Sequence, residues 1–313
     1  MKEFKLIRTS VGLIFFMVML ASFLSSCNVV RLRDKALVRQ LKRKEITSNV
    51  YQNDSVKVKY WMGGEGPAVL LLHGFGGNAL TTFSREMKEL SKDHLVIAPD
   101  LLWFGESNSS RTPTLATQTD AMLSLLDDLN IHELKVVGQS YGGFIAIDMV
   151  QRKNKEFLKV CIANCPGTTY DISELNEVCK RFEVRSIDEL FVFEDPAKFQ
   201  TLVNLSSYRN PKIPGFILRQ SYVEYFSRNH DDLKELLFTL QKDQDRYTDL
   251  AFLQSTPMMV LWGEKDELFS LHEGEKFARA VGADFQVIPK AGHASQMDRP
   301  KKFTRSISDY LRK

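Results

Sequence analysis

The chain has 313 residues, 43% of them hydrophobic, which is enough to bury one large core or one core with a small insert. Its 42 basic and 39 acidic side chains leave a net charge of +3, so the overall charge gives no reason to expect a nucleic-acid partner. Four irregularly spaced cysteines are too few for a disulfide framework or a zinc site, and we expect Cys161, Cys165 and Cys179 to be buried or half-buried free thiols.

The fourth cysteine closes an N-terminal targeting pattern. Three basic residues within positions 2–8 precede an almost unbroken apolar stretch of 14 residues, Val11–Leu24, which is short of the roughly 20 that span a bilayer. Leu24-Ser25-Ser26-Cys27 then ends it with small residues before a cysteine. This resembles the lipobox of a bacterial lipoprotein signal. The resemblance implies removal of residues 1–26, lipidation of Cys27 and attachment to a membrane of the cell envelope.

An uncleaved N-terminal anchor is the alternative. Seven basic residues between positions 31 and 44 outnumber those before the apolar stretch, and by the positive-inside bias an uncleaved segment would keep the protein on the cytoplasmic side. In a lipoprotein these residues would lie beside anionic headgroups. Residues 27–45 are predicted to form a basic helical tether in either case.

From residue 46 onward, short apolar runs alternate with helical patterns. A hairpin is predicted over 46–52 and 56–62, with Asn53-Asp54 at its turn. Six continuous apolar runs follow, at 68–72, 94–98, 134–137, 158–163, 257–262 and 285–288, and helical stretches lie near 79–91, 114–129, 141–152, 271–281 and 300–312. Continuous runs are typical of strands covered on both faces, so the sequence predicts an α/β fold with a doubly wound, mostly parallel sheet.

About ninety residues between Asn164 and Pro257 interrupt the alternation. Segments 172–182, 216–227 and 232–241 have helical spacing, and the stretch is rich in aromatic residues. We predict a helical cap at 169–250, inserted between the sixth and seventh core strands, with the core formed by 46–168 and 251–313. The cap either packs its own small core or serves as a lid that builds an apolar pocket.

The motif Gly138-Gln139-Ser140-Tyr141-Gly142-Gly143 directly follows the run at 134–137. It indicates a strand that turns sharply into a helix with a serine at its apex, because glycine tolerates the close backbone approach of such a turn. The Tyr141 N–H would then face an incoming oxyanion. A serine hydroxyl is a poor nucleophile until a base accepts its proton, so a base and its acid partner must lie elsewhere in the chain.

His293 is the candidate base, because it lies in a small-residue loop between the last predicted strand and the final helix. The candidate acid is Asp266, which follows the preceding strand; Glu264 and Glu267 in the same loop are weaker alternatives. Ser140, Asp266 and His293 would all lie at carboxyl ends of strands, where such sheets place their functional loops. The glycine-rich loop His73–Gly77 would supply a second oxyanion donor, the Phe75 N–H, and His73 would brace that loop.

Five motifs in this order resemble the α/β-hydrolase fold family, most closely its capped esterases and lipases of the monoacylglycerol-lipase-like and carboxylesterase branches. They are His73-Gly74-Phe75-Gly76-Gly77, Pro99-Asp100, the serine motif, Gly263-Glu264-Lys265-Asp266 and Gly292-His293. The resemblance implies a serine hydrolase that cleaves small carboxylic esters, with an apolar acyl group, through an acyl-enzyme on Ser140, without metal or cofactor. Trp103 departs from the glycine of many relatives; it either narrows the entrance or packs internally.

Two other functions stay open. Ser140 excludes siblings that use an aspartate at this turn, but hydrolases of carbon–carbon bonds or of peptides keep the serine. The second is a non-catalytic binding lipoprotein that keeps only the fold. Such a protein would not need a serine, an acid and a base placed together, which argues against it.

Overall fold

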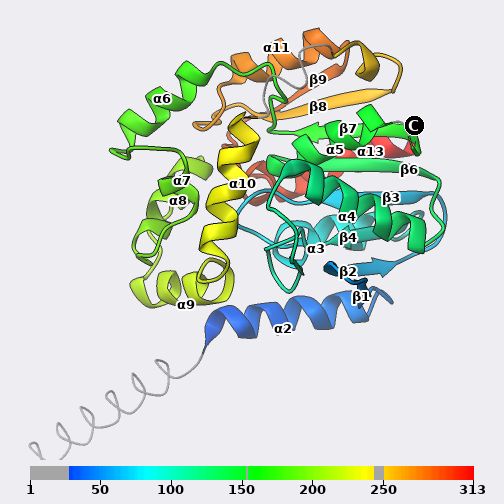
Figure 1. Ribbon diagram of the computed structural model, residues 1–313, viewed down its shortest axis with the longest axis horizontal. Helices are drawn as coiled ribbons and strands as arrows, with labels where there is room; N and C mark the ends of the chain where they lie inside the picture. The colour runs from blue at the N-terminus through cyan, green and yellow to red at the C-terminus, as the bar shows by residue number, and fades with distance from the viewer. Residues whose placement is uncertain (1–27, 153, 243–249) are drawn as a thin grey trace, which may run out of the picture.

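The computed structural model describes residues 28–152, 154–242 and 250–313 (Figure 1). The predicted signal segment and Cys27 lie outside these residues. Within the described ranges, no helix has the length and apolar character needed to cross a bilayer.

A nine-stranded sheet forms the centre of the molecule, with the strand order β1-β2-β4-β3-β6-β7-β8-β9 and β5 paired to β2. The strands are β1 (Thr47–Gln52), β2 (Val56–Gly63), β3 (Ala68–Leu72), β4 (Leu95–Pro99), β5 (Asn108–Ser109), β6 (Glu133–Gln139), β7 (Glu156–Ala163), β8 (Met258–Gly263) and β9 (Asp284–Ile288). Neighbours from β4 to β9 pair in parallel, whereas β2 pairs antiparallel with β1, β4 and β5. The predicted hairpin and mostly parallel α/β sheet are therefore confirmed; the two-residue β5 was not predicted.

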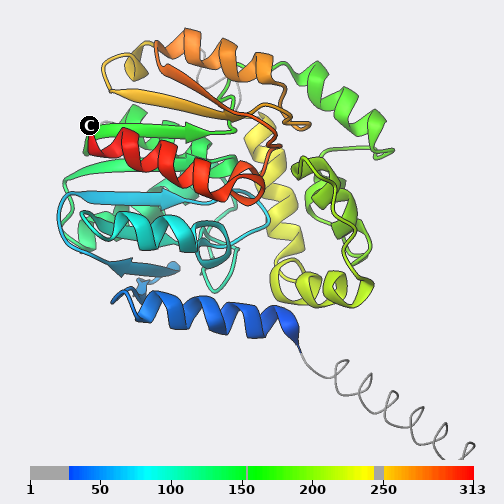
Figure 2. The same cartoon turned by 180° about the vertical axis from the view of Figure 1, so that it is seen from behind.

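Helices cover both faces of this sheet (Figures 1 and 2). The core helices are α3 (Ala79–Leu90), α4 (Leu115–Asp128), α5 (Tyr141–Arg152), α11 (Leu271–Val281), the short α12 (Ser295–Asp298) and α13 (Pro300–Arg312). Because successive strand residues point to opposite faces, Leu70 and Leu72 pack into a cluster with α4, α5 and α11. Val69 and Leu71 pack with α3 and α13. The apolar runs are continuous because both faces are buried.

Between β7 and β8, the described residues form five α-helices, which lie beyond the carboxyl ends of the parallel strands (Figure 1). They are α6 (Ile172–Arg181), α7 (Asp188–Phe191), α8 (Lys198–Ser206), α9 (Gly215–Tyr225) and α10 (His230–Lys242); a 3-10 turn, η2 (Ala251–Leu253), leads back to the core. Phe193, Leu202 and Phe226 form a small apolar cluster within this insert. The helices α7 and α8 had no counterpart among the predicted segments.

The helix α2 (Val29–Lys42) precedes the sheet and packs against α3 and α9. Its N-cap is Asn28, whose side chain accepts a hydrogen bond from the Arg31 N–H. Leu41, near its other end, is completely buried. A helix was predicted here as a tether; the structure shows instead that it lies along the folded domain (Figure 2).

Candidate active site

Ser140 lies at the apex of the turn between β6 and α5. Its φ of 51° is in the left-handed region, where a non-glycine residue is strained. The turn closes so tightly that a Cβ on Gly138 would lie 2.5 Å from the Gly142 carbonyl oxygen, and one on Gly142 would lie 2.2 Å from that of Leu72. Glycine is therefore required at both positions, as the motif predicts.

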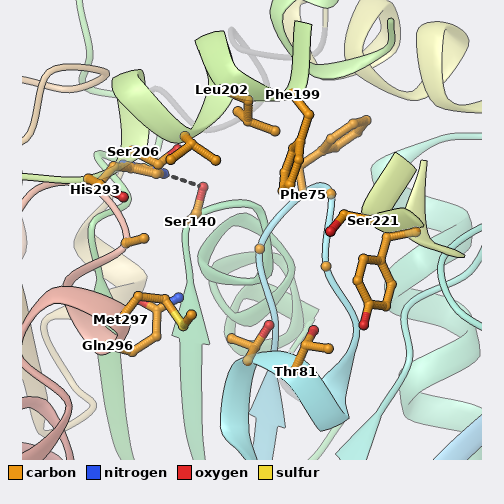
Figure 3. Close-up of a pocket in the computed structure, with 18 of the residues that line it drawn as sticks. Phe75, Thr81, Ser140, Phe199, Leu202, Ser206, Ser221, His293, Gln296 and Met297 are labelled. Atoms are coloured by element: carbon orange, nitrogen blue, oxygen red, sulfur yellow. Dashed lines mark hydrogen bonds between the residues drawn. The ribbon is translucent and has the colours of Figure 1, made fainter. Parts of the chain in front are cut away.

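His293 and Asp266 lie next to this serine. The Ser140 hydroxyl lies 2.8 Å from His293 Nε2, and His293 Nδ1 lies 2.9 Å from Asp266 Oδ2. A carboxylate only accepts hydrogen bonds, so His293 carries its proton on Nδ1 and leaves Nε2 to accept from the serine. All three side chains are buried, and Figure 3 shows the Ser140–His293 contact at the cavity wall. The structure thus brings together the three residues that the sequence singled out.

The Asp266 carboxylate receives four hydrogen bonds. Its Oδ1 accepts from the backbone N–H groups of Leu268 and Phe269, at 2.9 and 3.0 Å. Its Oδ2 accepts from His293 and from Asn164 Nδ2, which lies 2.9 Å away. These bonds fix both oxygens, so the acid has one orientation toward the imidazole.

Asn164 and Ser295 extend this network and were missed in the sequence. Asn164 follows β7 with a φ of 50° and is completely buried. Ser295 Oγ donates to Asn164 Oδ1 over 2.8 Å, which turns the amide so that its Nδ2 faces Asp266. The only signal was a polar residue at the end of a parallel strand, next to the strand that carries the acid.

His73 braces the loop that follows β3. Its ring is completely buried; Nδ1 donates to the Gly74 carbonyl over 2.7 Å, and Nε2 accepts from the Leu101 N–H over 3.0 Å. Burial lowers the pKa of His73 to about 4, so the ring stays neutral near pH 7. The bracing role predicted for His73 matches these contacts.

Phe75, in the same loop, lies beside the serine turn. Its ring meets the Tyr141 ring edge to face at 5.9 Å between centroids, and both residues line a cavity with Ser140. The two backbone segments named as oxyanion donors therefore lie beside Ser140, and their role as donors stays a prediction.

A cavity of about 570 Å³, here called the main cavity, opens beside Ser140 and His293 between the core and the helices α8 and α9. Its larger apolar lining residues include Phe75, Phe191, Phe199, Leu202, Val203, Ile213, Ile217, Phe226 and Met297. Thr81, Thr82, Gln139 and Gln296 form a polar part on the core side (Figure 3). A smaller apolar cavity of about 60 Å³ meets Ser140 from the side of α10. Ser140 therefore borders both cavities.

Trp103 does not line the main cavity or the smaller one. It is 2% exposed and packs in the core cluster that contains α4 and α5, so the interpretation that it narrows the entrance is wrong. Cys161, Cys165 and Cys179 are buried free thiols, as predicted. In the described ranges, no group of three or more histidine, cysteine, aspartate or glutamate side chains is arranged to hold a metal ion.

The chain is similar over most of its length to known hydrolases. It is 24% identical to the 2-hydroxymuconate semialdehyde hydrolase of a Pseudomonas strain over 260 residues, which cover 79% of this chain and 88% of the relative. It is 22% identical to human monoacylglycerol lipase over 262 residues, 79% of this chain and 76% of that enzyme.

Solved structures share the fold. A membrane phospholipase A, described as a bacterial virulence factor, superposes with a TM-score of 0.73 at 22% identity, over 97% of each chain. The 2-hydroxy-6-oxo-6-phenylhexa-2,4-dienoate hydrolase of a Rhodococcus strain gives 0.71 at 19% identity, over 86% of this chain and 99% of that enzyme. Residues 67–300 match the family profile described as alpha/beta hydrolase fold. The chain therefore belongs to the α/β-hydrolase fold family.

Proposed function

We propose that this protein is a serine hydrolase that cleaves carboxylic esters with an apolar acyl group. The observation that carries the proposal is the hydrogen-bonded chain Ser140–His293–Asp266, which ends at the wall of an apolar cavity. Acyl transfer needs a nucleophile, a base and an acid that are joined by hydrogen bonds in this order. A protein that only binds a ligand has no use for such an arrangement.

In the proposed reaction, Ser140 Oγ attacks the ester carbonyl while His293 Nε2 accepts the hydroxyl proton. The negative charge that develops on the carbonyl oxygen is held by the Phe75 and Tyr141 N–H groups. His293 then protonates the departing alcohol, which leaves an acyl-enzyme on Ser140. Water, deprotonated by His293, attacks the acyl carbon, and Ser140 leaves with the proton. The Asp266 carboxylate stabilises the imidazolium in both halves of the reaction. No step needs a metal or an organic cofactor.

The apolar character of the acyl group is inferred from the cavity. Most of the side chains on α8 and α9 that line the cavity are aliphatic or aromatic, among them Phe199, Leu202 and Ile217. An acyl chain transferred from water onto such a wall gains about 0.8 kcal/mol per buried methylene. The polar threonines and glutamines on the core side would face the alcohol part.

A hydrolase of carbon–carbon bonds is the second candidate. The two dienoate and semialdehyde hydrolases named above, which are similar to this chain, support it. A panel of p-nitrophenyl esters of graded acyl length, a dienone substrate and a peptide amide discriminates the candidates. We expect turnover of the esters, with the highest kcat/KM for medium or long acyl chains. Faster turnover of the dienone or the peptide would refute the ester assignment.

Ser140→Ala tests the nucleophile, and Ser206→Ala is the matched control because its hydroxyl lies in the same cavity. We expect S140A to lose activity by a factor on the order of 10⁶, as in other triad enzymes, and S206A to keep it. Undiminished turnover by folded S140A would refute the mechanism.

We further propose that the protein is held at a membrane of a bacterial cell envelope through a lipid on Cys27, with an uncleaved N-terminal anchor as the alternative. The lipobox-like sequence supports it. Mass spectrometry should find the lipid on Cys27, and Cys27→Ser should release the protein from the membrane fraction. Unchanged membrane association and mass in C27S would refute lipidation.

A further inference from the structure

The three sides of α9 face three different surroundings. Ile217, Ser221 and Tyr225 line the main cavity. Gln220 and Glu224 face α2: the Val29 N–H donates to Gln220 Oε1 over 2.9 Å, and Arg31 forms a 2.8 Å ion pair with Glu224. The third side carries Phe216, Arg219 and Val223, at the i, i+3, i+7 spacing of a single helix face. This third side has an unusual composition.

That third side is apolar and basic, and it is exposed. Phe216 and Val223 are 51% and 48% exposed, although both are side chains that folding normally buries. Arg219 lies between them, and the exposed Lys212 precedes the helix. Residues 207–228 contain four basic side chains and one acidic side chain, Glu224, which is already paired with Arg31. We call Lys212, Phe216, Arg219 and Val223 the docking face.

The main cavity opens beside this face. Four of its lining residues are exposed, namely Arg33 on α2, Arg209 and Pro211 in the loop between α8 and α9, and Met297 on α12. The mouth is therefore bordered by α2, by the loop that leads into α9 and by α12. Ile213 in this loop and Ile217 on α9 are apolar residues of the cavity wall.

The chain also reaches this place from its N-terminus. The Val29 N–H donates to Gln220 on α9, so Asn28, the first described residue, lies beside this helix. The apolar stretch Val11–Leu24 precedes it by only a few residues. A lipid on Cys27 and an uncleaved apolar anchor would both bring the same side of the molecule to a bilayer (Figure 1 shows where α2 begins beside α9).

We propose that the docking face rests on a bilayer containing anionic lipids, and that the substrate is a lipid ester that passes from this bilayer, past α2 and the loop that leads into α9, through the mouth of the main cavity to Ser140. Aromatic and aliphatic side chains that insert at the headgroup boundary, with basic side chains beside them, are the recognised composition of interfacial surfaces. The proposal rests on the ester-hydrolase function for its substrate, but the contact with the bilayer can be tested without turnover.

The location of the face is tested by fluorescence in the full-length protein. The chain has three tryptophans, and Trp61, Trp103 and Trp262 are all buried. Phe216→Trp adds an exposed reporter on the docking face, and Phe238→Trp on α10, which replaces a 60% exposed phenylalanine beside Asp231 and Glu235, is the matched control. With phosphatidylcholine–phosphatidylglycerol vesicles, F216W emission should shift to the blue and be quenched by brominated lipid, whereas F238W emission should change in neither way.

Two results would overturn the contact. F216W that stays accessible to acrylamide while the protein is bound to vesicles would show that the face points away from the bilayer. A blue shift that depends on protein concentration without vesicles would show that a second copy of the chain covers the face.

The functional consequence is tested with two substrates. F216S/V223S should lower turnover of a long-chain ester embedded in the vesicles about tenfold or more, and leave turnover of a soluble short-chain ester within twofold, because none of these residues lines the main cavity. K212E/R219E should lower vesicle turnover at least about fivefold and remove its preference for phosphatidylglycerol. F238S should change neither assay.

Equal loss on both substrates, or no loss on vesicles, would refute the lipid route. If the wild-type protein cleaves no ester at all, the proposed function fails, and the fluorescence experiment still decides whether the face contacts the bilayer.

Discussion

Asn164 is expected to be a positioning residue for the acid, and its replacement gives the sharpest test of the active-site network. The residue does not line the main cavity; its side chain is linked to the Ser140–His293 pair through Asp266 Oδ2, which lies 2.9 Å from Asn164 Nδ2. In Asn164→Ala that oxygen loses one of its two donors, and the buried Ser295 hydroxyl loses its acceptor.

The size of the effect follows from the bond that is lost. A hydrogen bond to a charged group contributes about 1.5–3 kcal/mol. If the whole of this free energy is lost from the transition state, in which the imidazolium forms, kcat falls about 10- to 100-fold, because each 1.36 kcal/mol is a factor of ten in rate. KM for a soluble ester should change little, because Asn164 does not line the main cavity.

Asn164→Asp is the more informative partner variant. It keeps the shape but places a second carboxylate against Asp266, and two like charges at this distance favour binding of a shared proton. We expect kcat to fall at least as far as in N164A, and the pH–rate profile to change shape, which a purely structural defect would not cause.

The assay is the pH dependence of kcat and KM on a soluble short-chain ester, with circular dichroism to verify folding. Ser295→Ala should give a smaller loss of the same kind, since Asn164 would keep its contact with Asp266 but lose its own orienting bond. A folded N164D with wild-type kcat and an unchanged pH profile would refute the role of Asn164.

Three further predictions concern the loop, the cavity and the core. His73→Ala should lower kcat about tenfold or more while leaving KM nearly unchanged, because the loop that carries the Phe75 N–H loses both hydrogen bonds of its brace; an unchanged kcat would contradict this. Leu202→Trp fills the main cavity, so kcat/KM should fall for long acyl chains and be kept for acetate, and equal loss for all chain lengths would refute the acyl assignment. Glu86 is buried and receives a 2.6 Å hydrogen bond from Thr304, and burial raises its pKa from 4.5 to about 7. Stability should therefore fall by about 3 kcal/mol as pH rises from 4.5 through 7, because the unfolded carboxyl ionises first; urea unfolding of Glu86→Gln should lack this loss, and identical slopes in both proteins would count against it.

The residues at the carboxyl ends of the strands were predictable because their signals are local. An apolar run followed by a glycine-flanked serine, or by a loop with an acid or a histidine, marks a strand end, and parallel pairing then brings Ser140, Asp266 and His293 to one edge. The order of strands and helices along the sequence is therefore enough to predict that these three residues lie close together.

The parts that were missed depend on contacts between distant segments. The role of the Asn164 amide depends on its hydrogen bonds to Asp266 and Ser295, which lie more than a hundred residues away in the sequence. Neither an asparagine nor a serine at these positions is a distinctive sequence signal. The basic pattern of α2 predicted a helix but could not show that it packs against α9, because the partner surface belongs to the cap. Trp103 offered two interpretations with the same sequence signal, and only its burial separates them.

The central claim is that Ser140 is a nucleophile activated by His293. Labelling with a fluorophosphonate probe, followed by peptide mass spectrometry, measures this directly, because the probe forms a stable adduct only with an activated serine. We predict one adduct per chain on Ser140 in the folded protein, no adduct in S140A, and labelling slowed by at least about a hundredfold in His293→Ala. A folded wild-type protein that remains unlabelled, or an H293A variant labelled at the wild-type rate, would contradict the account.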